Sequence, residues 1–137
     1  MTKASLVLIE QVILLLVFAI AAVLCLQAFV WADVQSQTMA DTDCALAEAQ
    51  SAAEVLKACH GDFAAAAQQW GGRWDGQSWT IAFDQNWIKD AVEAGFVLRI
   101  TPCDSGIPYL GKARAAVCRE EYLLVELDVC WQEVASP

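Results

Sequence analysis

The chain has 137 residues, of which 58% are hydrophobic, and its formal net charge is −9. This length suits one modest domain, or a membrane anchor with a small domain attached. Only Lys3 and Glu10 carry charge before Asp33, so 7 basic and 16 acidic residues lie from Asp33 onward. Such an acidic region repels phosphate groups, which argues against nucleic acid as a direct partner.

An almost entirely apolar run extends from Leu6 to Trp31. The part from Val12 onward has about 20 residues, enough for a helix to cross a hydrocarbon core of about 30 Å. Lys3 precedes the run and acidic residues follow it, so the positive-inside rule places the N-terminus in the cytoplasm and the rest outside. A cleaved secretory signal is the alternative, but its apolar core usually has only about 7–15 residues before an A-x-A site. We therefore expect a single-pass protein of the cell membrane.

Neither proline nor glycine occurs between Leu6 and His60, which predicts one continuous helix of more than about 50 residues. Beyond Asp33 this helix becomes amphipathic, because apolar residues recur on one face at helical spacing. The residues of this stripe are Ala45, Leu46, Ala49, Ala52, Ala53 and Leu56.

A short second helix is expected in the segment DFAAAAQQW. Gly61 would end the long helix, Asp62 would cap the short one, and the glycine pair that follows Trp70 would close it. Its inner face would carry Phe63, Ala67 and Trp70. We interpret Trp70 and Trp74 of the segment WGGRWDG as packing residues, since this segment lacks the order of glycines found in nucleotide sites.

Four later segments alternate between apolar and polar residues and predict strands: SWTIAFD, GFVLRIT, GKARAAVCR and EYLLVELDVCW. In the last segment the apolar face would comprise Leu123, Val125, Leu127, Val129 and Trp131. A small sheet with one apolar face needs a cover, which the stripe on the long helix supplies. The predicted fold class is α+β: a long N-terminal helix, membrane-spanning in its first half, whose second half packs on a sheet of three or four antiparallel strands.

The six cysteines form no CxxC pair. Cys25 lies in the apolar run, where it acts as a small apolar residue. Cys44 and Cys59 would lie about 22 Å apart on the predicted helix, too far for a disulfide. For the remaining three, disulfides and free thiols are both compatible with the spacing. These three are Cys103, Cys118 and Cys130.

The segment KASLVLIEQ places Glu10 near the start of an apolar helix, behind a short basic leader. With the amphipathic extension and the small sheet, it resembles the type IV pilins and the pseudopilins of type II secretion and competence systems. In that family a prepilin peptidase removes the leader, and the mature chain, methylated at its N-terminus, has glutamate at its fifth position. The resemblance implies cleavage between Ser5 and Leu6, with a cut after Ala4 as the alternative.

Some residues depart from the family pattern and favour a minor pilin or pseudopilin. Ser5 stands where glycine is usual, Leu6 stands where phenylalanine is frequent, and the helix-kinking proline of major pilins is absent.

The chain is expected to have four parts: a leader (1–5), a transmembrane and assembly helix (6–32), an amphipathic extension (33–60), and a short helix with a sheet domain (61–137).

The resemblance also implies a role for Glu10 in assembly. In the family's filaments this glutamate pairs with the free N-terminal amine of a neighbouring subunit, and a buried charge is tolerable when it is paired. A simpler interpretation places Glu10 at the level of the cytoplasmic headgroups, with the true span starting at Val12. The implied partners are other pilin-like subunits, the prepilin peptidase and the membrane, and the implied destination is an extracellular filament.

No catalytic residue, cofactor or metal site is expected. His60 follows Cys59 at the predicted helix end, where a polar terminal residue is the better interpretation. Asp41 and Asp43 lack the spacing of a calcium loop. Glu126 and the acid two residues later share one strand face, which suits a solvated surface better than a catalytic dyad.

Two functions follow from these patterns. The first is a structural pilin-like subunit that assembles through its N-terminal helix into a type IV pilus or a type II secretion or competence-like filament. The second is a monomeric, signal-anchored binding module outside the cytoplasm. The position of Glu10 favours the first, as does the lack of a spacer rich in glycine, serine or proline between anchor and domain.

Overall fold

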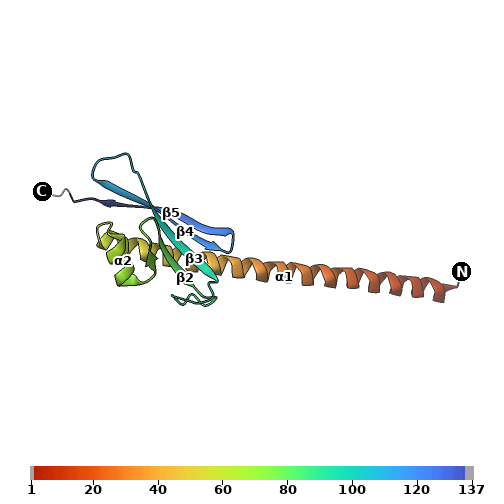
Figure 1. Cartoon of the computed structure of the whole chain (residues 1–137). Coiled ribbons are helices and arrows are strands. Elements are labelled where there is room, and N and C mark those ends of the chain that lie inside the picture. Colours follow the sequence, from red (N-terminus) through yellow and green to blue (C-terminus); the bar gives the residue numbers. More distant parts are fainter. Residues whose placement is uncertain (1, 135–137) are drawn as a thin grey trace. The chain divides into compact units, whose positions relative to one another are not determined.

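The computed structural model describes residues 2–134 of the chain (Figure 1). It contains two helices and a five-stranded antiparallel sheet, so the α+β class is confirmed. The elements are α1 (Lys3–Ala58), α2 (Phe63–Trp70), β1 (Arg73–Trp74), β2 (Trp79–Phe83), β3 (Phe96–Cys103), β4 (Leu110–Arg119) and β5 (Tyr122–Gln132). The chain divides into two compact units, residues 1–39 and 40–137, and each is described by itself.

The first unit is helical from Lys3 onward, as the absence of proline and glycine predicts. All of its described side chains are exposed, including every apolar residue from Leu6 to Trp31. By length and composition α1 could cross a membrane. An apolar helix that no other part of its unit covers needs a non-aqueous environment or a partner, which is consistent with a single-pass anchor.

The end of α1 is built by two residues in left-handed conformation, His60 (φ 53°) and Gly61 (φ 83°). The Gly61 amide donates to the carbonyl of Leu56 and the His60 amide to that of Lys57, both at 3.0 Å. This pair of bonds is the Schellman arrangement that commonly ends helices. The sequence indicated Gly61 as the terminator, whereas the structure places His60 at the first left-handed position.

Helix α2 begins and ends where the sequence predicts. The carboxylate of Asp62 accepts a hydrogen bond from the Ala65 amide at 3.1 Å, and Gly71 ends the helix with φ 103°. Phe63 on the inner face is buried, as is Ala66, while the indole of Trp70 is half-buried against the core. The cap fixes where the chain turns from α1 back toward the sheet.

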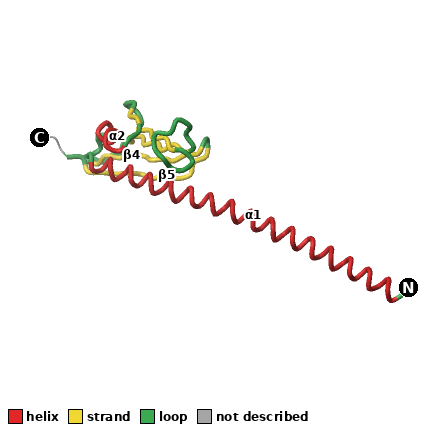
Figure 2. The backbone as a smooth tube through the Cα atoms, turned by 90° about the horizontal axis from the view of Figure 1, so that it is seen from below, coloured by secondary structure: helices red, strands yellow, loops and turns green. Residues whose placement is uncertain are grey.

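The sheet is a simple meander in the order β1-β2-β3-β4-β5, with every neighbouring pair antiparallel. Figure 2 shows its strands in yellow beside the end of α1. The four expected strands are present, and β1 is a fifth. It is only two residues long and folds back on β2 through a turn that Asp75 stabilises, accepting from the Gln77 and Ser78 amides at 2.8 Å. These amides, that of Ser78 most, lower the pKa of the Asp75 carboxyl.

The core lies where the second half of α1 packs on one face of the sheet. The helix contributes mainly small side chains: Ala45, Ala49, Ala52, Ala53 and Leu56. The sheet contributes large ones, among them Trp79, Ile81, Phe83, Phe96, Leu98 and Ile100. Because alanines have small side chains, the helix backbone can lie close to the sheet, where the large strand side chains are buried against it.

Two residues expected in the core are exposed. Leu46 keeps 39% of its surface accessible, although its neighbour Ala45 is fully buried. Leu123 is 53% exposed, because the register shifts where β4 passes from Val117 to Cys118: Val117 pairs with Val125 but Cys118 pairs with Leu123. This bulge inserts one residue into β5 and reverses the alternation of its faces.

The indole of Trp131 closes the core near the turn between the helices. A Cβ atom at Gly61 or Gly111 would collide with this ring. Both positions therefore need glycine, because the ring occupies the space that a side chain would take.

Candidate functional site

Glu10 lies among apolar side chains on the first turns of α1. Its neighbours one turn before and after are Leu6, Val7, Ile13 and Leu14, each between 54% and 56% exposed. In sequence the closest charges are Lys3, about 10 Å away along the helix axis, and Asp33, about 34 Å away. Within residues 2–134, no ion pair or hydrogen bond of the Glu10 side chain is found.

The lack of a partner matters if the Glu10 side chain is moved from water into an apolar environment. A carboxylate that leaves water needs a cation and hydrogen-bond donors, or it becomes protonated. Lys3 is two helical turns away, and within residues 2–134 the two side chains form no ion pair. In an apolar environment the Glu10 carboxylate therefore needs a cation that residues 2–134 do not place beside it.

The predicted processing bond between Ser5 and Leu6 lies in the first turn of α1. The amides of both residues donate to the carbonyl of Thr2, at 3.0 Å and 3.4 Å. A first turn is held by few hydrogen bonds and frays most easily. Opening this turn exposes the bond without disturbing the rest of the helix.

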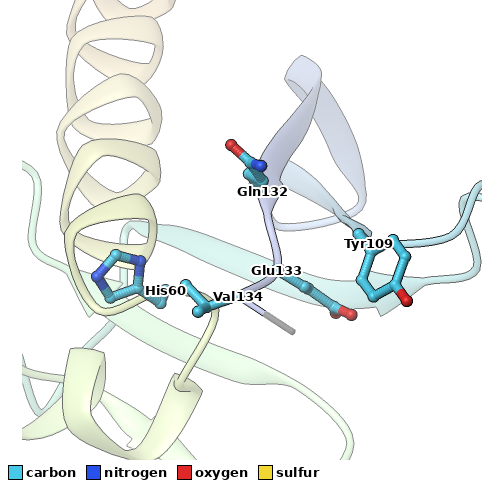
Figure 3. Close-up of a pocket in the computed structure, with 5 residues that line it drawn as sticks. All are labelled: His60, Tyr109, Gln132, Glu133 and Val134. Atoms are coloured by element: carbon cyan, nitrogen blue, oxygen red, sulfur yellow. The ribbon is translucent and has the colours of Figure 1, made fainter. Parts of the chain in front are cut away.

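His60 and Cys59 are adjacent in sequence, but their side chains lie next to different parts of the chain. The thiol of Cys59 donates to the Gln69 side-chain oxygen at 3.5 Å, toward α2. His60 lines a pocket of about 530 Å³, together with Tyr109 and the end of β5 (Figure 3). In this view His60 and Val134 lie on one side and Tyr109 on the other. The two residues thus do not form a nucleophile–base pair.

The acids singled out on β5 are exposed and paired with cations of β4. Arg114 contacts Glu126 at 3.1 Å and Asp128 at 3.2 Å, and Lys112 contacts Asp128 at 3.2 Å. The hydrogen bonds from Lys112 and then Arg114 lower the pKa of the Asp128 carboxyl. This cross-strand network ties β4 to β5.

Asp41 takes part in a long-range contact within the globular unit. Its carboxylate contacts the Arg119 guanidinium at 3.3 Å, joining α1 to the end of β4. Within residues 2–134, no group of three or more His, Cys, Asp or Glu side chains is placed to hold a metal ion. The contact that the structure gives Asp41 is thus the ion pair with Arg119.

The tryptophans of WGGRWDG pack as expected. Trp74 stacks on Phe63 with ring centroids 4.7 Å apart, and Trp70 meets Trp79 edge-on at 6.0 Å. The ammonium of Lys89 lies 3.3 Å from the centroid of the Trp70 ring. Partial burial is the main cause that lowers the pKa of Lys89, against the opposing charges of Glu48 and Asp90. Both tryptophan rings therefore pack against side chains of the same chain.

All six cysteines are free thiols in the described chain. Cys103 and Cys130 both flank Lys112 in register, from opposite sides, so a whole strand separates them. Neighbouring strands are about 4.8 Å apart, so two strands separated by a third are too far apart for a disulfide.

Two exposed features at the sheet edges were not identified from the sequence. One is a groove of about 450 Å³ beside β5, lined in part by Leu46. The other is the pair Ile88 and Val92, 62% and 104% exposed, in the segment between β2 and β3. That segment shows turn residues but no periodicity, so the sequence offered no sign of which apolar side chains it exposes.

Comparison with known protein families, with curated proteins and with solved structures finds no match for this chain. The resemblance to pilins thus depends on the segment from Lys3 to Gln11 and on the order of the elements.

Proposed function

We propose that this chain is a structural, non-enzymatic, pilin-like subunit, a minor pilin or pseudopilin. It is anchored in the membrane and assembles through its N-terminal helix into a type IV pilus or a type II secretion or competence-like filament. The observation that carries the proposal is the isolated carboxylate of Glu10 on an exposed apolar helix. An acid in such a segment is expensive and is usually functional.

The continuity of α1 supports this proposal. The helix runs from Lys3 to Ala58 without a break, so the apolar segment and the residues packed on the sheet belong to one element. A tethered module would tend to have a flexible linker between anchor and domain. In a filament subunit, an unbroken helix carries the globular unit directly on the segment that makes the assembly contacts.

The position of Glu10 relative to the predicted cut also supports it. Removal of residues 1–5 would give Leu6 a free, positively charged amine in a chain whose apolar segment otherwise has no cation. That amine supplies the missing counter-charge for Glu10 of a neighbouring copy. Processing by a prepilin peptidase would thereby be coupled to assembly, because only cleavage places an amine on Leu6, at the start of the apolar segment.

The corresponding localisation is a single pass through the cell membrane, with the N-terminus in the cytoplasm and residues from Asp33 onward outside. After assembly the subunit belongs to an extracellular filament. Its partners are other pilin-like subunits, the peptidase and the membrane, without direct contact to nucleic acid.

The test is Glu10→Leu in the full chain, with Gln11→Leu as the matched control. Glu10→Leu leaves the neighbour's amine buried without its partner, at a cost of about 3–5 kcal/mol per contact. We expect normal membrane insertion, because removing a charge favours the bilayer, and loss of assembly. Gln11→Leu removes a polar group next to Glu10 without removing charge and should assemble.

Assembly is measured as sheared filament, or as crosslinked subunits where filaments are too short to shear, against membrane-inserted monomer. Normal assembly of Glu10→Leu would discard the pairing role. The monomeric anchored module would then be the better description of the chain.

A further inference from the structure

The apolar segment of α1 has one face whose side chains follow a heptad spacing, with alternating steps of three and four residues. We call this row the heptad face; its members are Ile13, Leu16, Ile20, Val23, Gln27, Val30 and Val34. Apart from Leu16 and Gln27, all of them are β-branched. The apolar members are 53–59% exposed, so they are not covered within their own unit.

The two phenylalanines of the apolar segment lie on the opposite side of the helix. Each residue of an ideal α-helix turns by about 100°, so Phe18 lies about 180° from Gln27 and Phe29 about 160° from it. Trp31 flanks the heptad face at the end of the segment. A second helix can pack closely on the heptad face, because compact β-branched side chains occupy it in place of the phenylalanine rings.

Gln27 interrupts the heptad face with a side-chain amide. It lies with Val30 and Val34 along a shallow, mainly apolar hollow of about 340 Å³. Within residues 2–134, no hydrogen bond of this amide is found. Gln27 precedes Trp31, which ends the apolar segment, by four residues or about 6 Å along the helix axis. A carboxamide has two N–H donors and an acceptor oxygen, and these atoms need partners when hydrocarbon surrounds them.

The chemistry of the amide and the geometry of a membrane both select a second copy of this chain as the partner. One carboxamide satisfies another, because each donates an N–H to the oxygen of the other. Copies anchored by the same segment lie at the same depth in the bilayer, so Gln27 of one copy meets Gln27 of a parallel neighbour. From Val12 to Trp31 the segment contains no other amide and no hydroxyl or charged side chain. In a shifted register both amides would therefore face apolar side chains.

The place of Gln27 within the heptad face also favours a pair of helices. In parallel two-stranded coiled coils, one position of the repeat prefers isoleucine or valine, and a single polar residue there fixes the register and the number of strands. Gln27 stands at such a position, since Ile20 and Val34, seven residues before and after it, are β-branched. Glutamine side chains also form hydrogen bonds between helices in membranes.

We infer that Gln27 of one copy pairs with Gln27 of a second copy in the membrane, through parallel packing of their heptad faces. The inference rests on the proposed function, because it names the partner of the anchored subunit before assembly. In a filament, successive copies are displaced along the axis, so their Gln27 amides lie at different levels. The pair therefore belongs to the membrane-anchored subunits and opens when a subunit joins the filament.

The test measures the association of the full, unprocessed chain in phosphatidylcholine vesicles. Energy transfer between copies that carry a donor or an acceptor dye gives the association constant as the ratio of protein to lipid is varied. We expect dimers, and we expect Gln27→Leu to weaken association about three- to twentyfold, as for a hydrogen bond between membrane helices. Gln27→Asn keeps the amide and should keep most of the association. The matched control, Gln11→Leu, removes the same group from the opposite side of the helix and should leave association unchanged.

Disulfide formation between copies locates the contact. None of the six cysteines is buried, so all are replaced by serine or alanine in the chain used for this measurement. In that chain Val30→Cys should crosslink two copies, whereas Phe29→Cys, at nearly the same depth on the opposite side of the helix, should not. A chain that stays monomeric, a Gln27→Leu variant that associates normally, a Gln27→Asn variant as weak as Gln27→Leu, or equal crosslinking from positions 29 and 30 would each overturn the pairing.

The Gln27 pair and the proposed function fail separately. If Glu10→Leu stops assembly while Gln27→Leu associates normally in vesicles, the Gln27 pair is wrong and the pilin-like role stands. If Gln27→Leu weakens association while Glu10→Leu assembles normally, the pairing role of Glu10 is wrong and the Gln27 pair stands.

Discussion

Leu46 and Leu56 have the same side chain on the same helix, yet only one of them is part of the core. Leu56 is fully buried and Leu46 is 39% exposed. Ten residues on an ideal helix turn through about 1000°, so the two side chains point about 80° apart. Leu56 faces the centre of the sheet, whereas Leu46 faces its β5 edge, where it lines an open groove of about 450 Å³.

This difference gives a prediction with an internal control. In a soluble fragment of residues 33–137, Leu56→Ala should lower the free energy of unfolding by about 2–5 kcal/mol, because it opens a cavity in the core. Leu46→Ala should change it by at most about 0.5–1 kcal/mol, since the side chain is already partly in water. Urea denaturation of both variants measures the difference. Equal losses would contradict the helix-on-sheet packing.

At the residue scale, periodicity predicted most of the core but not its margins. The α1 stripe correctly included Ala45, Ala49 and Leu56, because a helix has one repeat along its whole length. Leu123 was placed on the wrong face, because a single inserted residue in β5 reverses the alternation. Neither glycine nor proline marks that bulge, so the local sequence carries no sign of it.

At the scale of elements, α1 combines segments suited to two different environments. All its buried residues lie between Ala45 and Leu56, in the unit that starts at Ala40. The segment before Asp33 is apolar and exposed, and it contributes no side chain to the core. The strands therefore depend on the end of α1 and not on its beginning.

We predict that a chain starting at Asp33 is soluble, monomeric and folded. It keeps all five α1 side chains of the core, and its new N-terminus carries an acid that favours a helix start. Size-exclusion chromatography and circular dichroism would check this. A chain starting at Gly61 lacks the α1 cover of the sheet and should not fold. An insoluble Asp33 fragment, or a folded Gly61 fragment, would show that the sheet is covered differently.

The elements themselves were predictable to different degrees. The length of α1, the cap of α2 and the four longer strands follow from local patterns that extend over several residues. Strand β1 has only two residues, too few for any alternation to appear. In the segment between β2 and β3, Trp87 stacks on Phe96 of the following strand, a contact that spacing alone does not indicate.

At the scale of the molecule, charge and hydrophobicity are separated along the chain. From Asp33 onward the chain has 7 basic and 16 acidic residues, so neighbouring copies repel each other there. Close packing of several copies must overcome this repulsion through apolar contacts and through specific pairs of opposite charge. A pair between Glu10 and a neighbour's amine would provide one such contact in the apolar segment, where screening by salt is weak.

The last prediction concerns the event that would create this amine. We expect native protein to lack residues 1–5 and to begin at Leu6 with a methylated amine, as intact-mass analysis would show. The bond lies in the first turn of α1, where the Ser5 and Leu6 amides share the Thr2 carbonyl, so little structure opposes its opening. Ser5→Gly should be processed at least as completely, because glycine destabilises that turn further and matches the family residue. A native chain beginning at Met1, at Thr2 or after Trp31 would contradict the prediction, since no copy would then carry the Leu6 amine that the proposed pairing with Glu10 needs.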